Sequence, residues 1–401
     1  MKDFIKFFKD LTDAIAKKIE PGLKNVGSIQ RKINIMLLLL ALISLFLNIS
    51  ACIRVYSNVP FRDRASRAEA AASSSWFYNS GPLEPLPVFA LKIPMSFFKA
   101  DPAKVQRTEG CIMFLLIFLA FIYVVKARTQ LSSALYASVI MSGLPWMGYY
   151  GMSGSAMLFS IFFLLLYWDF SDPDRLTLRR AVYAGLFAAA ACLSRSDSIF
   201  FIMINTAFFL PEYMKIKAWR HLGIIFGMVL FLCSPYALWQ KYTYGNAFFG
   251  QEMGLTRLIN AEIQNSGAEI PFVREPTGLL TFLFRDGFVS GIAEPFRGLI
   301  RALSYEFPRA IYYKLAVLLA FIGFYFAFIN GKKSIYALWL SAFIPVCFIA
   351  NMNVVLVQGG IPLEYYLASL PGILAAAGYG LQESSSALAD YIAKNPDKFH
   401  L

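Results

Sequence analysis

The chain has 401 residues, of which 58% are hydrophobic and only 15% are charged, and its mean hydropathy is positive. This composition excludes an ordinary soluble globular protein and indicates a membrane protein. The net charge of +12 would suggest nucleic-acid binding in a soluble protein, but here most basic residues lie between apolar segments, where they set orientation and contact lipid phosphates. We therefore expect a lipid bilayer, and no nucleic acid, as a partner.

The N-terminal segment, residues 1–32, is expected to be a cytoplasmic amphipathic helix. Lysines separate five hydrophobic residues at helical spacing: Phe4, Phe8, Leu11, Ile15 and Ile19. A helix with this pattern lies on the surface of the cytoplasmic leaflet. The alternative interpretation is a loosely ordered basic tail.

About ten apolar segments follow that approach the length of roughly 20 residues needed to span a bilayer. They are 33–53, 111–125, 131–148, 155–169, 181–194, 198–211, 221–240, 312–329, 334–355 and 362–381. The first begins too far from the N-terminus for a cleaved signal peptide, so we expect it to be retained. The predicted fold class is an all-α polytopic membrane protein, with a transmembrane domain over 33–381 and a cytoplasmic tail over 382–401.

Basic residues in short connections indicate the orientation. They gather in four places: 126–128, 175–180, 215–220 and 332–333. All four fall on one side of the membrane, which is the cytoplasmic side because short cytoplasmic loops carry the excess of Lys and Arg. With an even number of spans both termini lie there too, and the two long loops, 54–110 and 241–311, are extracytoplasmic and contain surface helices. We expect a prokaryotic plasma (inner) membrane.

Few side chains suit metal or nucleophilic catalysis. There are only two histidines and no Gly-rich phosphate loop, which excludes a histidine metal cluster and a Ser-His-Asp relay. The five cysteines lack the spacing of a disulfide framework or a zinc site. Carboxylates, arginines, lysines and tyrosines remain on the outer side. They suit transfer of a sugar from a polyprenyl phosphate, which requires a carboxylate to accept the acceptor's proton and cations to hold the phosphate.

The first long loop holds the two carboxylates that we expect to be catalytic. Asp63 follows the first span closely, and Glu84 stands between Pro82 and Pro85, which restrict its backbone. Lys92 follows and is a candidate for substrate binding. The alternatives are that Asp63 caps a helix or pairs with a neighbouring arginine, and that Glu84 belongs to a solvated turn.

Further candidates for substrate binding lie after the fifth span and in the second long loop. Arg195 and Asp197 stand at the outer ends of two apolar segments, where a charge is costly unless it is paired or faces a wet cavity. Arg195 therefore either binds the lipid phosphate or pairs with Asp197. The second loop, expected to bind substrate, offers Tyr244, Arg257 and Arg274, and a structural role is the alternative for each arginine.

Five segments each resemble a different part of one family's sequence pattern. They are 61–69 (FRDRASRAE), 83–88 (LEPLPV), 192–200 (CLSRSDSIF), 234–248 (SPYALWQKYTYGNAF) and 365–381. Together they resemble the GT-C superfamily of membrane glycosyltransferases, which includes the protein O-mannosyltransferases and the aminoarabinose transferase that acts on lipid A. Two positions depart from the family pattern. Arg64 stands where the family often has a second acid, and Glu364 stands where an arginine often opens the last helix.

The resemblance implies an inverting glycosyl transfer. Asp63 would act as general base on a hydroxyl or amine of a lipid, glycan or protein acceptor, and Glu84 would assist. The leaving polyprenyl phosphate would be held by Arg195, Lys92 or an arginine of the second loop. Some relatives use a divalent cation near the acidic loop, but nothing in this sequence requires a cofactor.

Two other classes of function remain open. A transporter or flippase of a lipid-linked substrate would show charged or broken segments at mid-membrane and two related halves, and the sequence shows no convincing halves. A non-catalytic subunit built on the same scaffold is consistent with the missing second acid after Asp63.

Overall fold

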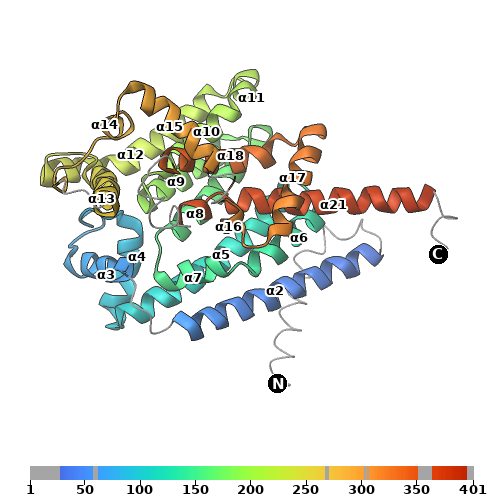
Figure 1. Ribbon diagram of the computed structural model, residues 1–401. Helices are drawn as coiled ribbons and strands as arrows, with labels where there is room; N and C mark the ends of the chain where they lie inside the picture. The colour runs from blue at the N-terminus through green and yellow to red at the C-terminus, as the bar shows by residue number, and fades with distance from the viewer. Residues whose placement is uncertain are drawn as a thin grey trace.

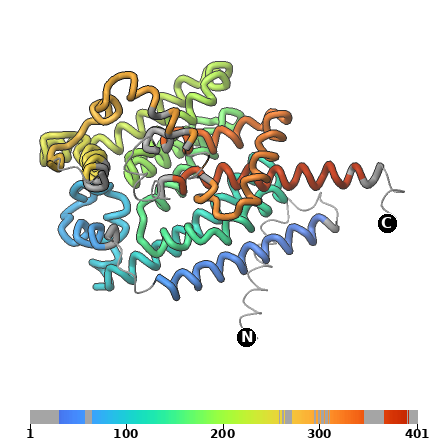
Figure 2. Tube along the Cα trace, in the orientation of Figure 1, coloured from blue at the N-terminus to red at the C-terminus, as the bar shows by residue number. Residues whose placement is uncertain are grey.

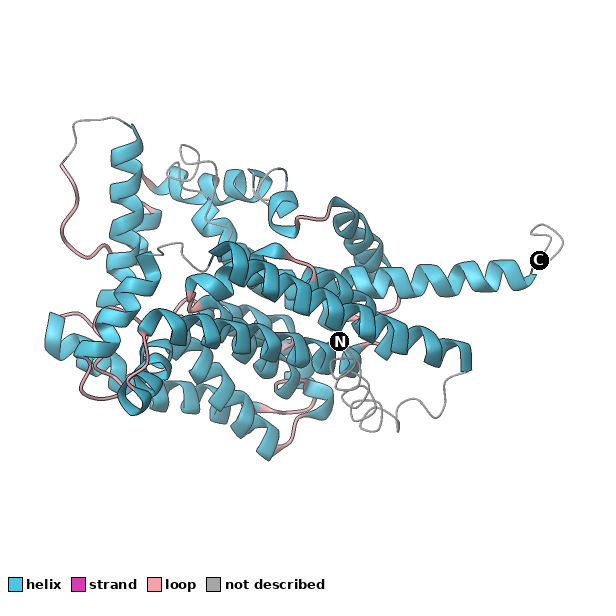
Figure 3. Ribbon diagram, turned by 90° about the horizontal axis from the view of Figure 1, so that it is seen from below, coloured by secondary structure: helices cyan, strands magenta, loops and turns pink. Residues whose placement is uncertain are grey.

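The computed structural model describes residues 28–56, 62–266, 271–301, 304, 307–350 and 364–394 (Figure 1, Figure 2). Within these ranges every regular element is a helix, and Figure 3 shows the described chain as helices joined by loops. The all-α class predicted from the sequence is therefore confirmed for this part of the chain. The amphipathic helix expected over 1–32 lies almost wholly outside it.

Eleven of the described helices form the bundle, and they follow the apolar segments of the sequence. They are α2 (Ser28–Tyr56), α5 (Pro102–Arg128), α6 (Leu131–Ser142), α7 (Pro145–Ser153), α8 (Met157–Phe170), α9 (Leu178–Ser194), α10 (Ser198–Phe208), α12 (Trp219–Tyr244), α17 (Lys314–Ile329), α18 (Lys333–Ala350) and α21 (Leu370–Lys394).

The other helices occupy the connections, including the two long loops. They are α3 (Arg62–Ser73), α4 (Pro85–Phe98), the 3-10 helix η1 (Pro173–Arg175), α11 (Leu210–Lys215), α13 (Phe249–Ser266), α14 (Leu279–Leu283), α15 (Phe288–Arg301), α16 (Phe307–Ile311) and α20 (Glu364–Leu367). Surface helices in both long loops were expected from the sequence.

The core of the bundle is apolar, and its helices approach one another closely at small residues. Phe114, Phe118 and Phe121 of α5 are buried in this core. Gly323 of α17 lies against the backbone of Ala376 in α21, and a side chain at Gly323 would collide with it. Close backbone approach at glycine and alanine is a common way for helices to pack within a membrane.

Three of the described helices are long and apolar enough to cross a membrane: α2 (over 30–56), α5 and α12. There are four if α7 and α8, which are bent by 119° at their junction, count as one broken span. Helices α6, α10 and α17 are apolar but shorter. A polytopic membrane protein is therefore supported, but the described residues do not form ten full-length spans.

The expected span 131–148 is instead two helices, α6 and α7. Leu144, between them, has φ −70° and ψ 115°, because the ring of the following Pro145 disfavours helical geometry at the residue before it. Helix α7 then ends at Gly154, whose φ of 74° lies in the left-handed region that favours glycine. The break at Leu144 divides a span that average hydropathy predicts as continuous, whereas Gly154 lies in the expected connection between the spans 131–148 and 155–169.

The helices of the first long loop and the ends of the described chain lie at opposite ends of the bundle (Figure 1). Helices α3 and α4 lie at one end, near the start of α13, where Gly250 approaches the carbonyl of Pro82. We call this the loop end. The start of α2 and the end of α21 lie at the opposite, terminal end. Helix α21 continues to Lys394, so the tail predicted from residue 382 begins as helix.

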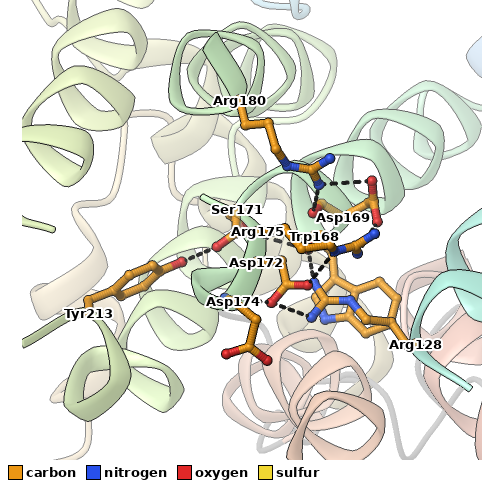
Figure 4. Close-up of polar contacts among 9 residues, drawn as sticks. All are labelled: Arg128, Trp168, Asp169, Ser171, Asp172, Asp174, Arg175, Arg180 and Tyr213. Carbon is orange, nitrogen blue, oxygen red and sulfur yellow. Dashed lines mark hydrogen bonds and ion pairs between the residues drawn. The ribbon is translucent and has the colours of Figure 1, made fainter. Parts of the chain in front are cut away.

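At the terminal end, buried ion pairs join α5, α8 and α9 (Figure 4). Asp169, which is fully buried, accepts from Arg175 at 2.7 Å and from Arg180 at 3.1 Å. Asp172 pairs with Arg128 at 2.8 Å and with Arg175 at 2.8 Å. Arginines that indicated membrane orientation in the sequence therefore also tie helix ends together.

Candidate functional site

Glu84 lies at the loop end, immediately before α4. Its backbone is extended, with φ −62° and ψ 138°, as expected before Pro85. Its side chain makes no capping hydrogen bond to α4 and contacts a distant part of the chain instead. Glu84 Oε1 accepts hydrogen bonds from the backbone N–H of Ser196 at 3.3 Å and from its hydroxyl at 3.2 Å, across a separation of 112 residues.

Ser196 belongs to the turn between α9 and α10, which also carries a guanidinium and a second carboxylate. Arg195 caps the C-terminus of α9, and Asp197 stands at the N-terminus of α10. Arg195 Nε donates to the two oxygens of Asp197 at 3.1 and 3.2 Å, and Nη2 donates to Oδ2 at 2.9 Å. The pairing that the sequence left open is therefore observed. We call Glu84, Arg195, Ser196 and Asp197 the acid–arginine site.

The surroundings of Glu84 alter its protonation. Although part of the residue remains exposed, its carboxylate lies against the α9–α10 turn, and loss of hydration raises the pKa of Glu84. The nearby charge of Arg195 and the hydrogen bond from Ser196 oppose this rise, while Asp197 adds to it. Glu84 therefore binds a proton more readily than an ordinary glutamate, which is a frequent property of catalytic acids and bases.

Helix α12 holds the first loop in place beside this site. The Tyr236 hydroxyl donates to the carbonyl of Leu83 at 2.9 Å, one residue before Glu84. In the same way, Tyr78 donates to the carbonyl of Leu232 at 3.0 Å. Tyr236 lies within the segment that resembles the GT-C pattern. The sequence of that segment did not indicate that Tyr236 would contact the backbone next to Glu84.

The other residues expected at the site have different surroundings. Asp63 lies in α3, but its side chain is outside the described residues. Lys92 donates hydrogen bonds to the backbone carbonyl and hydroxyl of Ser74, so it joins α4 to the segment after α3. Tyr244 stacks on Phe249, with ring centroids 4.2 Å apart.

The two arginines of the second loop that were candidates for substrate binding are exposed. Arg257 lies on α13, and Arg274 lies in the segment before α14. The hydrogen bonds of the described residues therefore bring together Glu84, Arg195 and Asp197, but they do not join Lys92 to that group. The roles proposed for these residues in substrate binding stay predictions.

The two carboxylates of the acid–arginine site already accept from donors of the protein. Glu84 accepts from Ser196 and Asp197 accepts from Arg195, so each already has donors. Within the described residues, no three His, Cys, Asp or Glu side chains gather in a way that could hold a metal ion. Calcium and magnesium are held by several oxygen ligands directed at one point, so a cation here would need ligands besides these two carboxylates.

A hollow of about 590 Å³ lies beside α12, lined by Ser234, Ala237, Leu238, Lys241 and 245–247. Its α12 residues recur at intervals of three and four, so they share one face of the helix. Tyr236 and Gln240, which contact the first loop and Gly250, project from the opposite face. The hollow is therefore separate from the acid–arginine site.

Two solved structures from Archaeoglobus fulgidus are similar in fold. One is the archaeal oligosaccharyltransferase AglB in complex with an inhibitory peptide and a dolichol-phosphate, at 12% identity and a TM-score of 0.47, with 92% of this chain and 52% of that chain covered. The other is the oligosaccharyltransferase in the apo form, at 12% identity and a TM-score of 0.41, with 89% and 52% covered.

The chain spans about half the length of these two structures. No protein-family model matches the sequence, and no curated protein matches it. Similarity at this level does not define a family for the chain, so its function has to be argued from its own residues.

Proposed function

We propose that this chain is a GT-C-like membrane glycosyltransferase that moves a sugar from a polyprenyl-phosphate donor to an acceptor at the extracytoplasmic face. The observation that carries this proposal is the acid–arginine site, in which Glu84 of the first loop lies beside Arg195 at the loop end. A carboxylate with a raised pKa beside a guanidinium offers a proton acceptor and a phosphate ligand in one place. The terminal end, with the start of α2, then faces the cytoplasm of a prokaryotic cell.

The reaction requires one proton transfer and one displacement. A carboxylate accepts the proton of the acceptor's hydroxyl or amine, and that oxygen or nitrogen attacks the anomeric carbon of the sugar. The bond from this carbon to the phosphate oxygen breaks, and its electron pair leaves with the polyprenyl phosphate. Attack from the opposite face inverts the anomeric centre. Asp63 and Glu84 are the two candidates for the base, and their separate substitution distinguishes them.

Arg195 has the right shape to receive the leaving phosphate. Its guanidinium already binds the carboxylate of Asp197 through two nitrogens, and carboxylate and phosphate are both recognised by this planar fork. A donor phosphate would replace Asp197 as the partner of Arg195. The negative charge that develops on the leaving phosphate would then be stabilised by a cation that is already oriented.

The test is sugar transfer by the purified protein in detergent, with radiolabelled polyprenyl-phosphate sugars as donors. Asp63→Asn and Glu84→Gln are compared with Glu69→Gln, which removes an exposed carboxylate on the same helix as Asp63. Loss of the base should lower turnover by about two orders of magnitude, while Glu69→Gln should match the wild type. Equal turnover in all three variants would exclude both carboxylates as the base.

A non-catalytic scaffold subunit is the second candidate, because Asp197 already neutralises Arg195 in this structure. Such a protein would bind the lipid-linked sugar without releasing the sugar. Tight lipid binding with no turnover for any donor would favour this function, or transport of the lipid, over transfer.

A further inference from the structure

Helix α3 carries a buried arginine beside exposed positions. Ala65, Ser66 and Glu69 are exposed, but Arg67 is only 5% exposed. Burial lowers the pKa of Arg67 to about 9, which leaves it a cation at neutral pH. A buried cation is costly unless its partners are well placed, so its contacts should reveal why it is there.

The guanidinium of Arg67 contacts three separate parts of the bundle. Arg67 Nη2 forms an ion pair with Glu109 of α5, and Nη1 donates to the carbonyl of Gly154 at 2.7 Å. The guanidinium carbon also lies 5.8 Å from the centre of the Phe159 ring in α8. One side chain therefore attaches α3 to α5, to the turn after α7 and to α8.

The receiving elements leave little room for movement. Gly110, next to Glu109, lies so close to Gly151 of α7 that a side chain at Gly110 would collide with the backbone. Gly154 holds its carbonyl at a left-handed turn with φ 74°. The partners of Arg67 thus belong to the packed bundle and not to a flexible loop.

Helix α3 also makes apolar contacts. Ala71 is buried with Val88 and Leu91 of α4 in a cluster of its own, separate from the main core. This cluster holds α3 against α4, which belongs to the same long loop, and Val105 of α5 also packs against it. The contacts of Arg67 with Glu109, Gly154 and Phe159 add polar attachments of α3 to the bundle itself.

Asp63 stands one helical turn before Arg67 in α3. We propose that Arg67 is a positioning residue, which clamps α3 onto α5 and the α7–α8 turn so that the turn containing Asp63 is held at the loop end. This inference rests on the proposed glycosyltransferase function. In this proposal the Arg67–Glu109 pair positions the turn of α3 that contains Asp63, and neither residue contacts the substrate.

The test compares Arg67→Gln and Arg67→Lys with Lys104→Gln, which removes an exposed cation from the first turn of α5. The first measurement is hydrogen exchange of the α3 amides in the full-length protein, which reports local opening without any substrate. Arg67→Gln should speed exchange in α3 by about tenfold or more and leave α5 and α8 unchanged. Lys104→Gln should exchange as the wild type does.

The second measurement separates kcat from KM for the donor. A positioning role predicts a fall in kcat of about 100-fold in Arg67→Gln, the scale of a misplacement near 1 Å, with donor KM little changed. Arg67→Lys keeps the charge but lacks the fork that holds a carboxylate and a carbonyl together, so it should keep the wild-type thermal stability and recover only part of kcat. Glu109→Gln should reproduce the kcat defect from the other side of the pair.

Three results would overturn the inference. Unchanged α3 exchange in Arg67→Gln would show that the clamp does not hold the helix, whatever the turnover. Faster α3 exchange with unchanged kcat would remove the positioning role. No turnover in the wild type would remove the proposed function and this role with it, while the exchange data would still report on the clamp.

Discussion

Replacement of Asp169 by asparagine should destabilise the protein strongly, because the side chain is fully buried and accepts from two arginines. Asparagine keeps the volume, so no cavity forms, but its amide N–H₂ would face guanidinium donors. Two charge-assisted hydrogen bonds at about 1.5–3 kcal/mol each suggest a loss of roughly 3–6 kcal/mol. Arg175 is 37% exposed and keeps Asp172, so we expect the lower end, about 3 kcal/mol.

Thermal unfolding in detergent measures this loss, and the midpoint should fall by several degrees. The matched control is Asp174→Asn, an exposed aspartate of η1, which should change stability by less than about 0.5 kcal/mol. If both variants unfold at the same temperature, the ion pairs of Figure 4 do not stabilise the helix ends and the reasoning fails.

Four further outcomes are expected. Because burial raises the pKa of Glu84, kcat/KM should fall as the pH drops through that raised value and Glu84 gains a proton. This fall at low pH should be absent from the pH–rate profile of Glu84→Gln. The same fall in both proteins would exclude Glu84 as the base. Tyr236→Phe removes the hydrogen bond to Leu83 and should cost about 1 kcal/mol in denaturant unfolding. Gly378→Ala places a methyl group against the backbone of α6 and should cost about 1–3 kcal/mol, whereas Gly227→Ala meets open space and should not destabilise. Chelation of divalent cations should leave turnover unchanged, because Glu84 and Asp197 already accept from Ser196 and Arg195. A turnover that is lost on chelation and recovers only with added metal would show that a cation takes part.

The site illustrates which contacts the sequence can predict. Glu84 and the Arg195–Asp197 pair were both singled out, because charges beside apolar segments are conspicuous. The hydrogen bonds from Ser196 to Glu84 were not predicted, since the two residues are 112 positions apart and the packing of six α-helices and one 3-10 helix between them brings them together. The base role of Asp63 remains a prediction.

Arg67 was not predicted to be buried. In the sequence it belongs to a polar segment with several other charges, and helical spacing alone places it on a surface helix. Its burial depends on Glu109, 42 residues later, and on the Gly154 carbonyl, 87 residues later. No local pattern distinguishes an arginine that has such partners from one that is solvated.

The membrane class, the helical composition and the approximate positions of the helices could be predicted from the sequence, because they depend on local hydrophobicity and on backbone preferences along the chain. Even the break between α6 and α7 has a local cause in Pro145. The tertiary structure decided which carboxylate meets which arginine, which charges are buried and which helices α3 contacts. Such contacts join residues far apart in the chain, so they arise only when the helices pack.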